Sequence, residues 1–429
     1  MLTREENELL TRTGPGTPLG ALMRRYWLPA LLAEEISAPD GRPVRVQLLG
    51  ERLVAFRDST GQVGLLEEAC PHRGTSLALG RNEDGALRCL FHGWQFDRTG
   101  RCIDMPTEPL GSTFPLRVRA RAYPVREAAG IVWAYLGPAE TPPHFPEYQW
   151  IGLPSDQYRV WKILHECNYL QALDRDMNFA HVPIAHRRLS PQEIEAGVKL
   201  TDLDRQNTVP EVDVEPTAYG LRYVTISRPA EAVNPVRTAS FVAPCFLFLG
   251  PIQEHCVAMA FVPRDDTSNW HFLVRYSLSG PVDAERYAAT RGIDKLGPGF
   301  RKLRNLDNDF LQDREAMRQT FNGIEGVIVE DHALAELQGP IVDRTRETLC
   351  ATDAPIVALR DLLLHYAHAF AAGQEPVLLG QDPSLAFAEI GGTALTKPAQ
   401  ANWREAAPLH SGLAPRPDDW PQRSSTDRP

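Results

Sequence analysis

The chain has 429 residues, of which 43% are hydrophobic and 23% charged, and its formal net charge is −10. This length allows two or more domains with separate cores, and the acidic balance argues against nucleic acid or anionic membranes as partners. No apolar run is long enough to predict a membrane span, and no signal-peptide core is present at the N-terminus. The 7 cysteines show no paired pattern, which indicates reduced thiols of a cytoplasmic protein.

Residues 1–150 are predicted to form an N-terminal arm and a small antiparallel β domain. Thr3-x-x-Glu6 is a capping-box pattern that predicts a short first helix. Alternating apolar residues then predict β structure, with a hairpin over 44–56 and strands over 63–67 and 131–136. The Pro-rich segment 137–148 predicts the domain boundary near residue 150.

Residues 151–400 are predicted to form an α+β domain in which helices flank an antiparallel sheet. A helix is expected over 166–180, and the later helices are expected over 284–291, 309–319 and 353–371. The strands are expected over 221–227, 239–249, 256–262 and 272–276. Residues 401–429 are rich in Pro, Arg, Asp and Ser and are expected to form a flexible tail.

Two short motifs in the first domain carry residue types that bind metals, namely Cys70-Pro-His72 and Cys89-Leu-Phe-His92. Zinc accepts two cysteines and two histidines, but zinc fingers usually pair cysteine with cysteine across a short spacer. A Rieske [2Fe–2S] cluster holds one iron with two cysteines and the other with two histidines. The mixed pairs therefore favour a Rieske cluster, with a structural zinc site as the alternative.

A second group of candidate ligands follows the expected helix 166–180. His181 and His186 are five residues apart, which is about 140° on a continuous helix, so they would not face one ion there. Pro183 disfavours regular helix and allows the chain to turn between them. Such a pair alone is equally consistent with ordinary surface or core histidines. An electron-carrying cluster in the same chain favours the metal interpretation.

The chain resembles the oxygenase α-subunits of Rieske non-heme iron oxygenases, in the branch similar to phthalate 4,5-dioxygenase. The resemblance rests on CPHRG…CxxHGW at 70–94, on residues 168–186 and on residues 330–344, and it covers most of the chain except the tail. It implies that a Rieske cluster is held by Cys70, His72, Cys89 and His92. It also implies that His181, His186 and Asp331 form a facial triad on ferrous iron. From the residues alone, the adjacent Glu330 is an alternative third ligand.

The same resemblance implies a terminal oxygenase that uses Rieske electrons and O₂ at a mononuclear iron to hydroxylate an aromatic substrate. Because the sequence has no Gly-x-Gly-x-x-Gly loop, NAD(P)H is expected to act through a separate flavin and iron–sulfur reductase. A homotrimer is also implied. The sequence does not decide whether the reaction is dihydroxylation, monohydroxylation or O-demethylation of an aryl ether. The alternative to an enzyme is a Rieske electron-transfer protein that has no catalytic iron of its own.

One position departs from the family pattern. The family normally has an aspartate three residues before the first iron histidine, linking a Rieske histidine of one subunit to an iron histidine of its neighbour. This chain has Asn178 there. An amide keeps the hydrogen-bonding capacity but loses the negative charge. Asp174, one helical turn earlier on the same face, is a candidate that could partly replace it, and Asp176, on another side of the helix, is a poorer candidate.

Two arginines are candidates for binding substrate. Arg228 and Arg237 flank the expected strand region 221–249, where a guanidinium could hold a carboxylate through two parallel hydrogen bonds. A surface arginine paired with a nearby acid is the alternative for each of them. Because the family branch that the chain resembles uses aromatic carboxylates, an aromatic carboxylate is the expected substrate.

Overall fold

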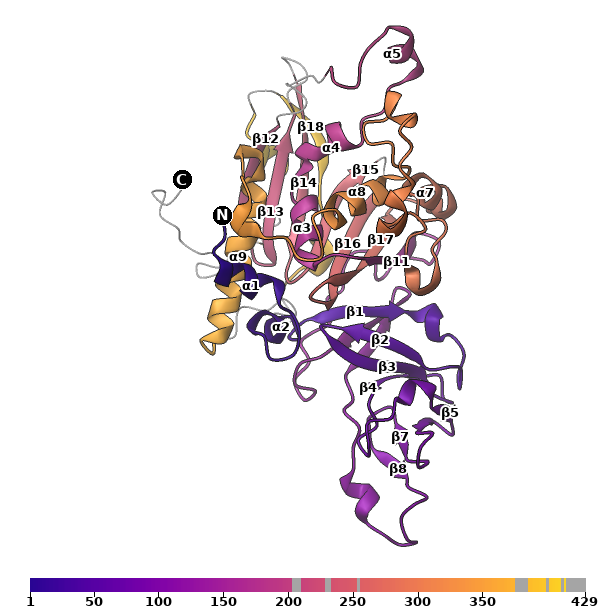
Figure 1. The fold of residues 1–429 in the computed structure, drawn as a ribbon. Helices are drawn as coiled ribbons and strands as arrows, with labels where there is room; N and C mark the ends of the chain where they lie inside the picture. Colours follow the sequence, from indigo (N-terminus) through magenta and orange to yellow (C-terminus); the bar gives the residue numbers. More distant parts are fainter. Residues whose placement is uncertain are drawn as a thin grey trace. The chain divides into compact units, whose positions relative to one another are not determined.

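The computed structural model describes residues 1–202, 210–227, 233–252, 255–374, 385–398, 401–409 and 413. The chain divides into two compact units, each shown in Figure 1. One unit contains Thr13–Pro146 and Val262–Asp265, and the other contains Met1–Arg12, Glu147–Phe261 and Asp266–Pro429. The expected boundary near residue 150 lies close to Glu147. The sequence predicted that the first twelve residues belong with the β domain. In the structure they group with the larger unit instead.

The smaller unit is built from three small antiparallel sheets, ordered β1-β10-β9, β2-β3-β4 and β5-β6-β7-β8. Their strands are β1 (Trp27–Leu32), β2 (Val44–Leu48), β3 (Glu51–Arg57), β4 (Val63–Glu67), β5 (Arg81–Glu83), β6 (Ala86–Arg88), β7 (Gln95–Asp97), β8 (Cys102–Asp104), β9 (Val125–Ala128) and β10 (Ile131–Tyr135). Short helical segments are α2 (Pro18–Met23), η1 (Ala33–Ile36), η2 (Leu77–Leu79) and η3 (Phe114–Arg117). The hairpin predicted over 44–56 corresponds to β2 and β3.

The core of the smaller unit lies where the cysteine motifs meet the sheets. Phe56 and Leu66 from β3 and β4 pack with Leu87 and Phe96 from β6 and β7. The cysteines of both motifs belong to this same buried cluster. Burying these apolar side chains stabilises the two loops that carry the motifs.

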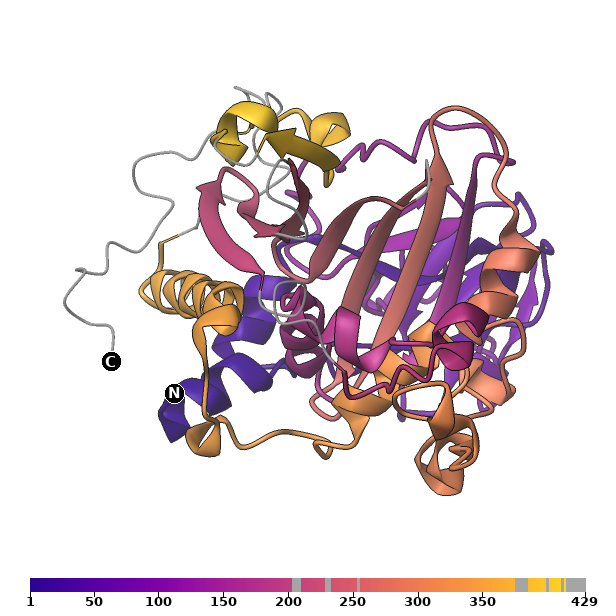
Figure 2. The same cartoon turned by 90° about the horizontal axis from the view of Figure 1, so that it is seen from above.

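The larger unit is organised around an antiparallel sheet of 8 strands, ordered β11-β17-β16-β15-β14-β13-β12, with β18 pairing with β14. The strands are β11 (Tyr158–His165), β12 (Glu211–Thr217), β13 (Gly220–Ile226), β14 (Val233–Val242), β15 (Phe246–Ile252), β16 (His255–Asp265), β17 (Ser268–Ser277) and β18 (Ala394–Pro398). Figure 2 shows this sheet from above. The architecture is the α+β domain with an antiparallel sheet that the sequence predicted.

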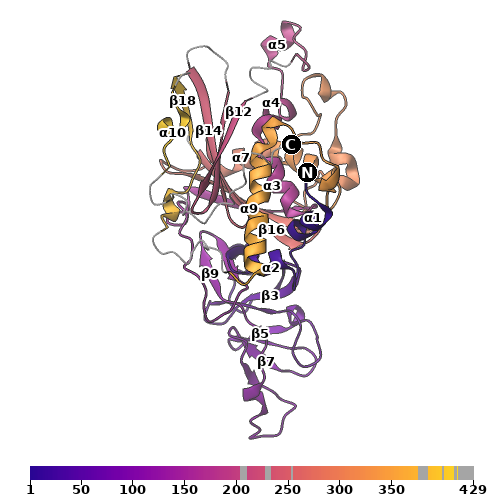
Figure 3. The ribbon, with the colours of Figure 1, turned by 90° about the vertical axis from the view of Figure 1, so that its left-hand side faces the viewer.

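Helices of the larger unit cover the sheet and carry the second candidate site. The α-helices are α1 (Arg4–Thr11), α3 (Tyr169–Asp176), α4 (Val182–Ala185), α5 (Pro191–Glu195), α7 (Ala284–Arg291), α8 (Val327–Glu336), α9 (Ala354–Ala371) and α10 (Trp403–Ala406). Short 3-10 segments are η4 (Phe179–His181), η5 (Pro298–Phe300), η6 (Leu306–Leu311), η7 (Ala316–Arg318), η8 (Arg344–Arg346), η9 (Ala351–Asp353) and η10 (Phe387–Glu389). Helices α3, α8 and α9 lie along one face of the sheet (Figures 1 and 3). No helix among the described residues is long and apolar enough to cross a membrane.

Three expected elements differ from the structure. The helix expected over 166–180 is shorter, because β11 extends to His165 and α3 occupies only Tyr169–Asp176. The single strand expected over 239–249 is two strands, β14 and β15, separated by a turn at residues 243–245 that contains Pro244. Proline cannot donate to a strand ladder, which explains the break. The helix expected over 309–319 is replaced by η6 and η7.

The expected flexible tail begins with ordered structure. Helix α10 lies within residues 401–409, and Trp403 is buried against Val224, Ile226 and Val236 of the sheet. Its indole donates a hydrogen bond of 2.9 Å to Asp213. The expectation of flexibility is therefore wrong for this part of the tail. Residues 410–412 and 414–429 lie outside the described residues.

Candidate functional site: two metal centres

The two cysteine motifs form matching loops in the smaller unit. In each loop the cysteine carbonyl accepts a hydrogen bond from the glycine four residues later, Gly74 at 2.8 Å and Gly93 at 3.0 Å. The cysteine N–H in turn donates to the carbonyl five residues later, at 2.9 Å for Cys70 and 2.8 Å for Cys89. Both glycines have positive φ, +76° and +73°, a conformation that side chains disfavour. The glycines therefore allow two equivalent turns to present one metal-binding set.

The four donors separate into an inner and an outer pair. Cys70 and Cys89 are buried, whereas His72 is exposed and His92 is half-buried. The rings of His72 and His92 have centroids 4.5 Å apart, and Nδ1 of His92 is buried without a hydrogen-bond partner. Two buried cysteines and two more exposed histidines are the donors of a Rieske [2Fe–2S] cluster, in which the cysteines hold one iron and the histidines the other. The residues present fit such a cluster.

The second candidate centre brings together His181, His186 and Asp331, whose ligand atoms lie within 4.8 Å of one another. His181 is the last residue of η4, His186 follows the short helix α4, and Pro183 stands in the first turn of α4. Both imidazoles reach Asp331 on α8. Nε2 of His186 and Nε2 of His181 lie 3.0 Å and 3.4 Å from Oδ1 of Asp331. The expectation that Pro183 turns the chain between the histidines is therefore wrong, because residues 182–185 are helical and the backbone becomes extended earlier, at Asn178. A proline in the first turn of a helix lacks only an N–H that would be unpaired there anyway.

Oδ1 of Asp331 has the properties of a metal ligand. It is buried, has no hydrogen-bond partner, and faces two imidazole nitrogens. Although burial opposes ionisation, Arg175, His181 and His186 hold the pKa of Asp331 well below its ordinary value, so the group is a carboxylate. Two imidazoles and one carboxylate are the donor set of mononuclear non-heme iron(II) sites. The residues present fit such an iron.

Glu330, the alternative third ligand, lies on the other side of His186. Its Oε2 is 2.5 Å from Nδ1 of His186, and its Oε1 accepts a hydrogen bond of 2.5 Å from Nη2 of Arg188. Both oxygens are therefore occupied, and the side chain contacts the ring nitrogen opposite to the one that faces Asp331. This geometry favours Asp331 as the ligand and places Glu330 where it orients the imidazole. This role of Glu330 was not predicted from the sequence.

Asn178 is held by hydrogen bonds of its side chain and its backbone within its own chain. Its side-chain oxygen accepts from the backbone N–H of Ala180 at 2.8 Å, and its amide donates to Oδ1 of Asp353 at 2.6 Å. Its backbone carbonyl accepts from Nδ1 of His181 at 2.5 Å. A carboxylate, that of Asp353, thus stands directly beside the position where the family aspartate is missing.

Asp174 does not have the free carboxylate that a substitute bridge requires. It is buried and accepts hydrogen bonds from Arg344 at 2.9 Å and from Arg360 at 2.7 Å. These contacts argue against Asp174 as the substitute bridge, because two guanidinium groups already occupy its carboxylate. Asp176 is also buried, and Nη2 of Arg175 lies 2.8 Å from its Oδ2.

Of the two candidate substrate arginines, Arg237 lies on β14 and Arg228 lies outside the described residues. Arg237 is exposed and lines a cavity of about 300 Å³. The segment that carries the iron histidines contributes Phe179, Val182 and Pro183 to the same cavity. The remaining lining residues lie on or next to strands β12, β13 and β14: Pro210, Thr225, Ser227 and Pro235. Among the lining residues that the structure describes, apolar side chains combine with the guanidinium of Arg237.

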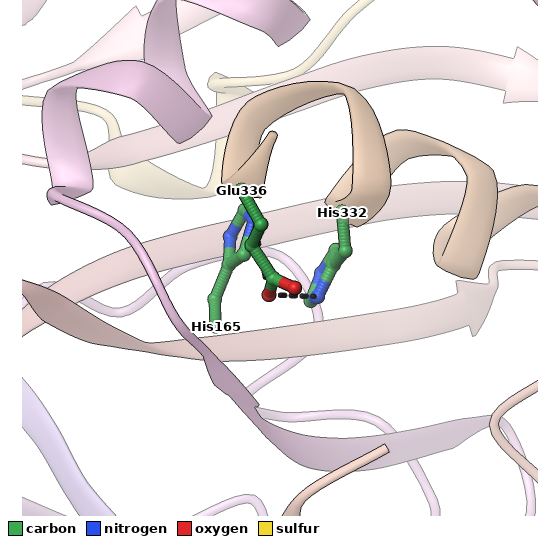
Figure 4. A group of neighbouring side chains, drawn as sticks. All are labelled: His165, His332 and Glu336. Carbon is green, nitrogen blue, oxygen red and sulfur yellow. Dashed lines mark ion pairs between the residues drawn. The ribbon is translucent and has the colours of Figure 1, made fainter. Parts of the chain in front are cut away.

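A third group consists of His165, His332 and Glu336, which are all fully buried (Figure 4). His332 directly follows Asp331 in the sequence. The two imidazole rings of this group are stacked, with centroids 3.7 Å apart and planes inclined by only 14°. Metal-binding lone pairs lie in the ring plane, so nearly parallel stacked rings cannot both direct them at one ion. In addition, the ammonium of Lys302 lies 2.7 Å from Oε1 of Glu336. The group is therefore better described as a buried ion pair flanked by neutral imidazoles.

Comparison with known proteins agrees with this architecture. Residues 26–115 match the Rieske [2Fe-2S] domain, and residues 134–411 match the family described as LigXa C-terminal domain like. The phthalate 4,5-dioxygenase oxygenase subunit of Pseudomonas putida is 39% identical over 394 residues, which are 89% of this chain and 90% of the relative. The 3-chlorobenzoate-3,4-dioxygenase oxygenase subunit of Comamonas testosteroni is 35% identical over 391 residues, 85% of this chain and 88% of the relative.

A solved structure supports the same fold. Dicamba monooxygenase bound to dicamba superposes with a TM-score of 0.58 at 19% identity and covers 82% of this chain and 99% of the other. A Rieske domain followed by an α+β domain with a 2-His-1-carboxylate set defines a Rieske-type oxygenase. The chain belongs to the family of Rieske non-heme iron oxygenase α-subunits and is similar to phthalate 4,5-dioxygenase. Its cofactors are a Rieske [2Fe–2S] cluster and a mononuclear iron.

Proposed function

We propose that this terminal oxygenase inserts oxygen into an aromatic carboxylate at an iron held by His181, His186 and Asp331. The observation that carries the proposal is the single buried oxygen, Oδ1 of Asp331, which faces both imidazoles and lacks any other partner. The ferrous iron, when bound, supplies the centre at which O₂ is activated. A protein that only carried electrons would have no need for this second set of donors.

The neighbouring residues orient the ligands and the substrate. Glu330 holds the Nδ1 side of His186, and the carbonyl of Asn178 holds the Nδ1 side of His181, so that both Nε2 atoms point inward. Arg237 would bind the substrate carboxylate, while Phe179 and Val182 provide apolar contact for the ring. The two relatives reported above are named for phthalate and 3-chlorobenzoate, both aromatic carboxylates, which supports this substrate class.

Cys70, Cys89, His72 and His92 would hold the cluster that stores electrons for the iron. The relatives are named as oxygenase subunits, which supports a separate electron donor. We infer that this donor is a flavin and iron–sulfur reductase that oxidises NAD(P)H. A homotrimer, in which the cluster of one subunit serves the iron of the next, and a cytoplasmic location complete the proposal.

Iron content tests the assignment of ligands. The purified protein is expected to contain about three irons per chain, two in the cluster and one in the mononuclear site. Asp331→Ala should lose one iron and keep the visible absorption of the cluster, whereas Glu330→Ala should retain part of the third iron. Equal loss in both variants, or two irons in the unsubstituted protein, would contradict the assignment.

Product analysis tests the reaction. The protein is combined with NADH and a surrogate reductase and offered benzoates, phthalates and matched uncharged aromatics. Hydroxylated carboxylates, with label from ¹⁸O₂ in the product, are the expected result. Conversion of only uncharged aryl ethers, with release of formaldehyde, would instead identify an O-demethylase.

A further inference from the structure

Arg175 connects the proposed iron carboxylate to a second buried acid. Its Nη1 lies 2.9 Å from Oδ2 of Asp331, and its Nη2 lies 2.8 Å from Oδ2 of Asp176. The arginine side chain is 5% exposed, and each carboxylate side chain is 10% exposed. A guanidinium between two carboxylates in a buried setting forms charge-assisted bonds of fixed geometry. Arg175 therefore constrains how Asp331 can turn.

The two oxygens of Asp331 consequently differ. Oδ1 faces the two imidazoles and has no hydrogen-bond partner, whereas Oδ2 is occupied by Arg175. A guanidinium has no free lone pair and is always protonated, so it cannot itself bind a metal. With Oδ2 engaged in this way, Asp331 offers one oxygen to an ion between the histidines.

The end of helix α3, which carries Arg175 and Asp176, is also held in place by a hydrogen bond. Asp176 is the last residue of α3, and its backbone carbonyl accepts a hydrogen bond of 2.6 Å from the hydroxyl of Tyr223 on β13. Arg175 belongs to the same helix, which leads through Asn178 into the histidine loop. One short segment thus carries both His181 and Arg175. Arg175 forms a direct ion pair with Asp331, which lies 156 residues later in the chain.

We propose that Arg175 is a positioning residue that keeps Asp331 bound to the iron through one oxygen and raises the reduction potential of that iron. The proposal rests on the ligand set of the proposed function. A fixed positive charge next to a ligand favours the less positive ferrous state over the ferric state, because the interior screens charge weakly. One-oxygen ligation leaves a further position open for water, O₂ or substrate.

Substitution of Arg175 by methionine tests both parts of the proposal. Arg175→Met removes the charge and frees Oδ2 to chelate the metal. The Fe(III)/Fe(II) potential of the mononuclear site, followed by the ferric EPR signal in a mediated titration, should then fall. In protein loaded with Mn²⁺ at this site, broadening of the EPR lines by ¹⁷O-water should report one fewer bound water. Arg175→Lys, which keeps the charge, should retain most of the potential.

Arg360 provides the matched control, because it is also a buried arginine that bonds to an acid on α3, Asp174 at 2.7 Å, without an ion pair to Asp331. Arg360→Met should leave the mononuclear potential and the Mn²⁺ spectrum unchanged. An unchanged potential and water count in Arg175→Met, with the third iron retained, would overturn this inference alone. Absence of a third iron from the unsubstituted protein would overturn the proposed function and the inference with it.

Discussion

His186 and Glu330 share a hydrogen bond of 2.5 Å between Nδ1 and Oε2, although they are 144 residues apart in sequence. The opposite nitrogen of the same ring, Nε2, lies 3.0 Å from Oδ1 of Asp331. Adjacent residues of one helix therefore contact the two sides of one imidazole. The carboxylate of Glu330, bonded to Nδ1 of His186, fixes the tautomer and the orientation of the ring that leave Nε2 free for a metal.

Replacing Glu330 should therefore weaken iron binding without affecting the cluster. Glu330→Gln removes the charge that holds His186 and Arg188, and loss of such an outer partner typically costs about 10- to 100-fold in metal affinity. Iron retained after dialysis against graded chelator, with cluster absorption as the internal reference, measures the change. Glu336→Gln on the same helix, which bonds to Lys302 instead, is the control for damage to α8. Equal losses in both variants would show that Glu330 acts only through helix stability.

Arg237 should set the preference for carboxylated substrates. A two-point guanidinium–carboxylate pair contributes about 1.5 to 3 kcal/mol, so Arg237→Gln should lower kcat/KM for an aromatic acid by roughly 10- to 100-fold. Activity on an uncharged aromatic of similar size should change little. Arg404→Gln, an exposed arginine that pairs with Asp213 and does not line the cavity, should leave the ratio as it was. The same ratio in Arg237→Gln and the unsubstituted protein would remove Arg237 from the substrate site.

The 2.6 Å contact between the Asn178 amide and Asp353 predicts the outcome of restoring the family aspartate. Asn178→Asp alone would place two carboxylates at hydrogen-bond distance, so the variant should lose stability. The exchange Asn178→Asp with Asp353→Asn keeps one donor and one acceptor and moves the charge to position 178. Its stability should recover, because the hydrogen bond is restored in reverse.

Electron transfer then shows whether the position of the charge matters. Oxidation of the prereduced cluster in a single turnover should be faster in the exchanged pair than in the unsubstituted protein, because a carboxylate holds a protonated imidazole more strongly than an amide does. Asp353→Asn alone controls for loss of the original carboxylate. Identical rates in all three proteins would show that the charge at position 178 does not control the coupling.

Local patterns predicted much of the fold. The helix expected over 284–291 has those limits as α7, and Thr3 caps α1 through the expected capping box with Glu6. The helix expected over 309–319 failed because Asp309, Phe310 and Leu311 adopt positive φ while Phe310 packs into a buried cluster. Tertiary packing of this kind overrides local propensity and leaves no periodic signal.

The ligand motifs were predictable from sequence because each combines reactive residue types with a short spacing. The supporting residues were not predictable, since Arg175 and Glu330 act on partners more than a hundred residues away. Asp174 shows the converse, because its spacing from Asn178 suggested a bridge while its actual partners, Arg344 and Arg360, lie far along the chain.

The ion pairs of Asp174 predict a specific contribution to acid stability. Burial alone would raise the pKa of Asp174, but Arg360 and Arg344 outweigh it and hold the pKa below the ordinary value. A carboxylate whose pKa is lower in the folded state stabilises the fold above its unfolded pKa of about 3.9, and this stability is lost as the pH falls through the folded value. At neutral pH, Asp174→Asn should cost about 3 to 5 kcal/mol, because it leaves buried guanidinium charge uncompensated.

Denaturant midpoints measured from pH 7 down to about pH 2 test this contribution. The difference between Asp174→Asn and the unsubstituted protein should be constant near neutrality and should shrink below about pH 4, where the aspartate of the unfolded chain takes up a proton. It should be lost once the pH falls through the lower pKa of the folded state, where the native aspartate is protonated and resembles the amide. Asp307 also has a lowered pKa through Arg301, but its side chain is 73% exposed. Asp307→Asn should therefore leave the midpoint nearly unchanged across the range, because solvent screens an exposed pair. A difference for Asp174→Asn that does not depend on pH would mean that packing, and not charge, accounts for its effect.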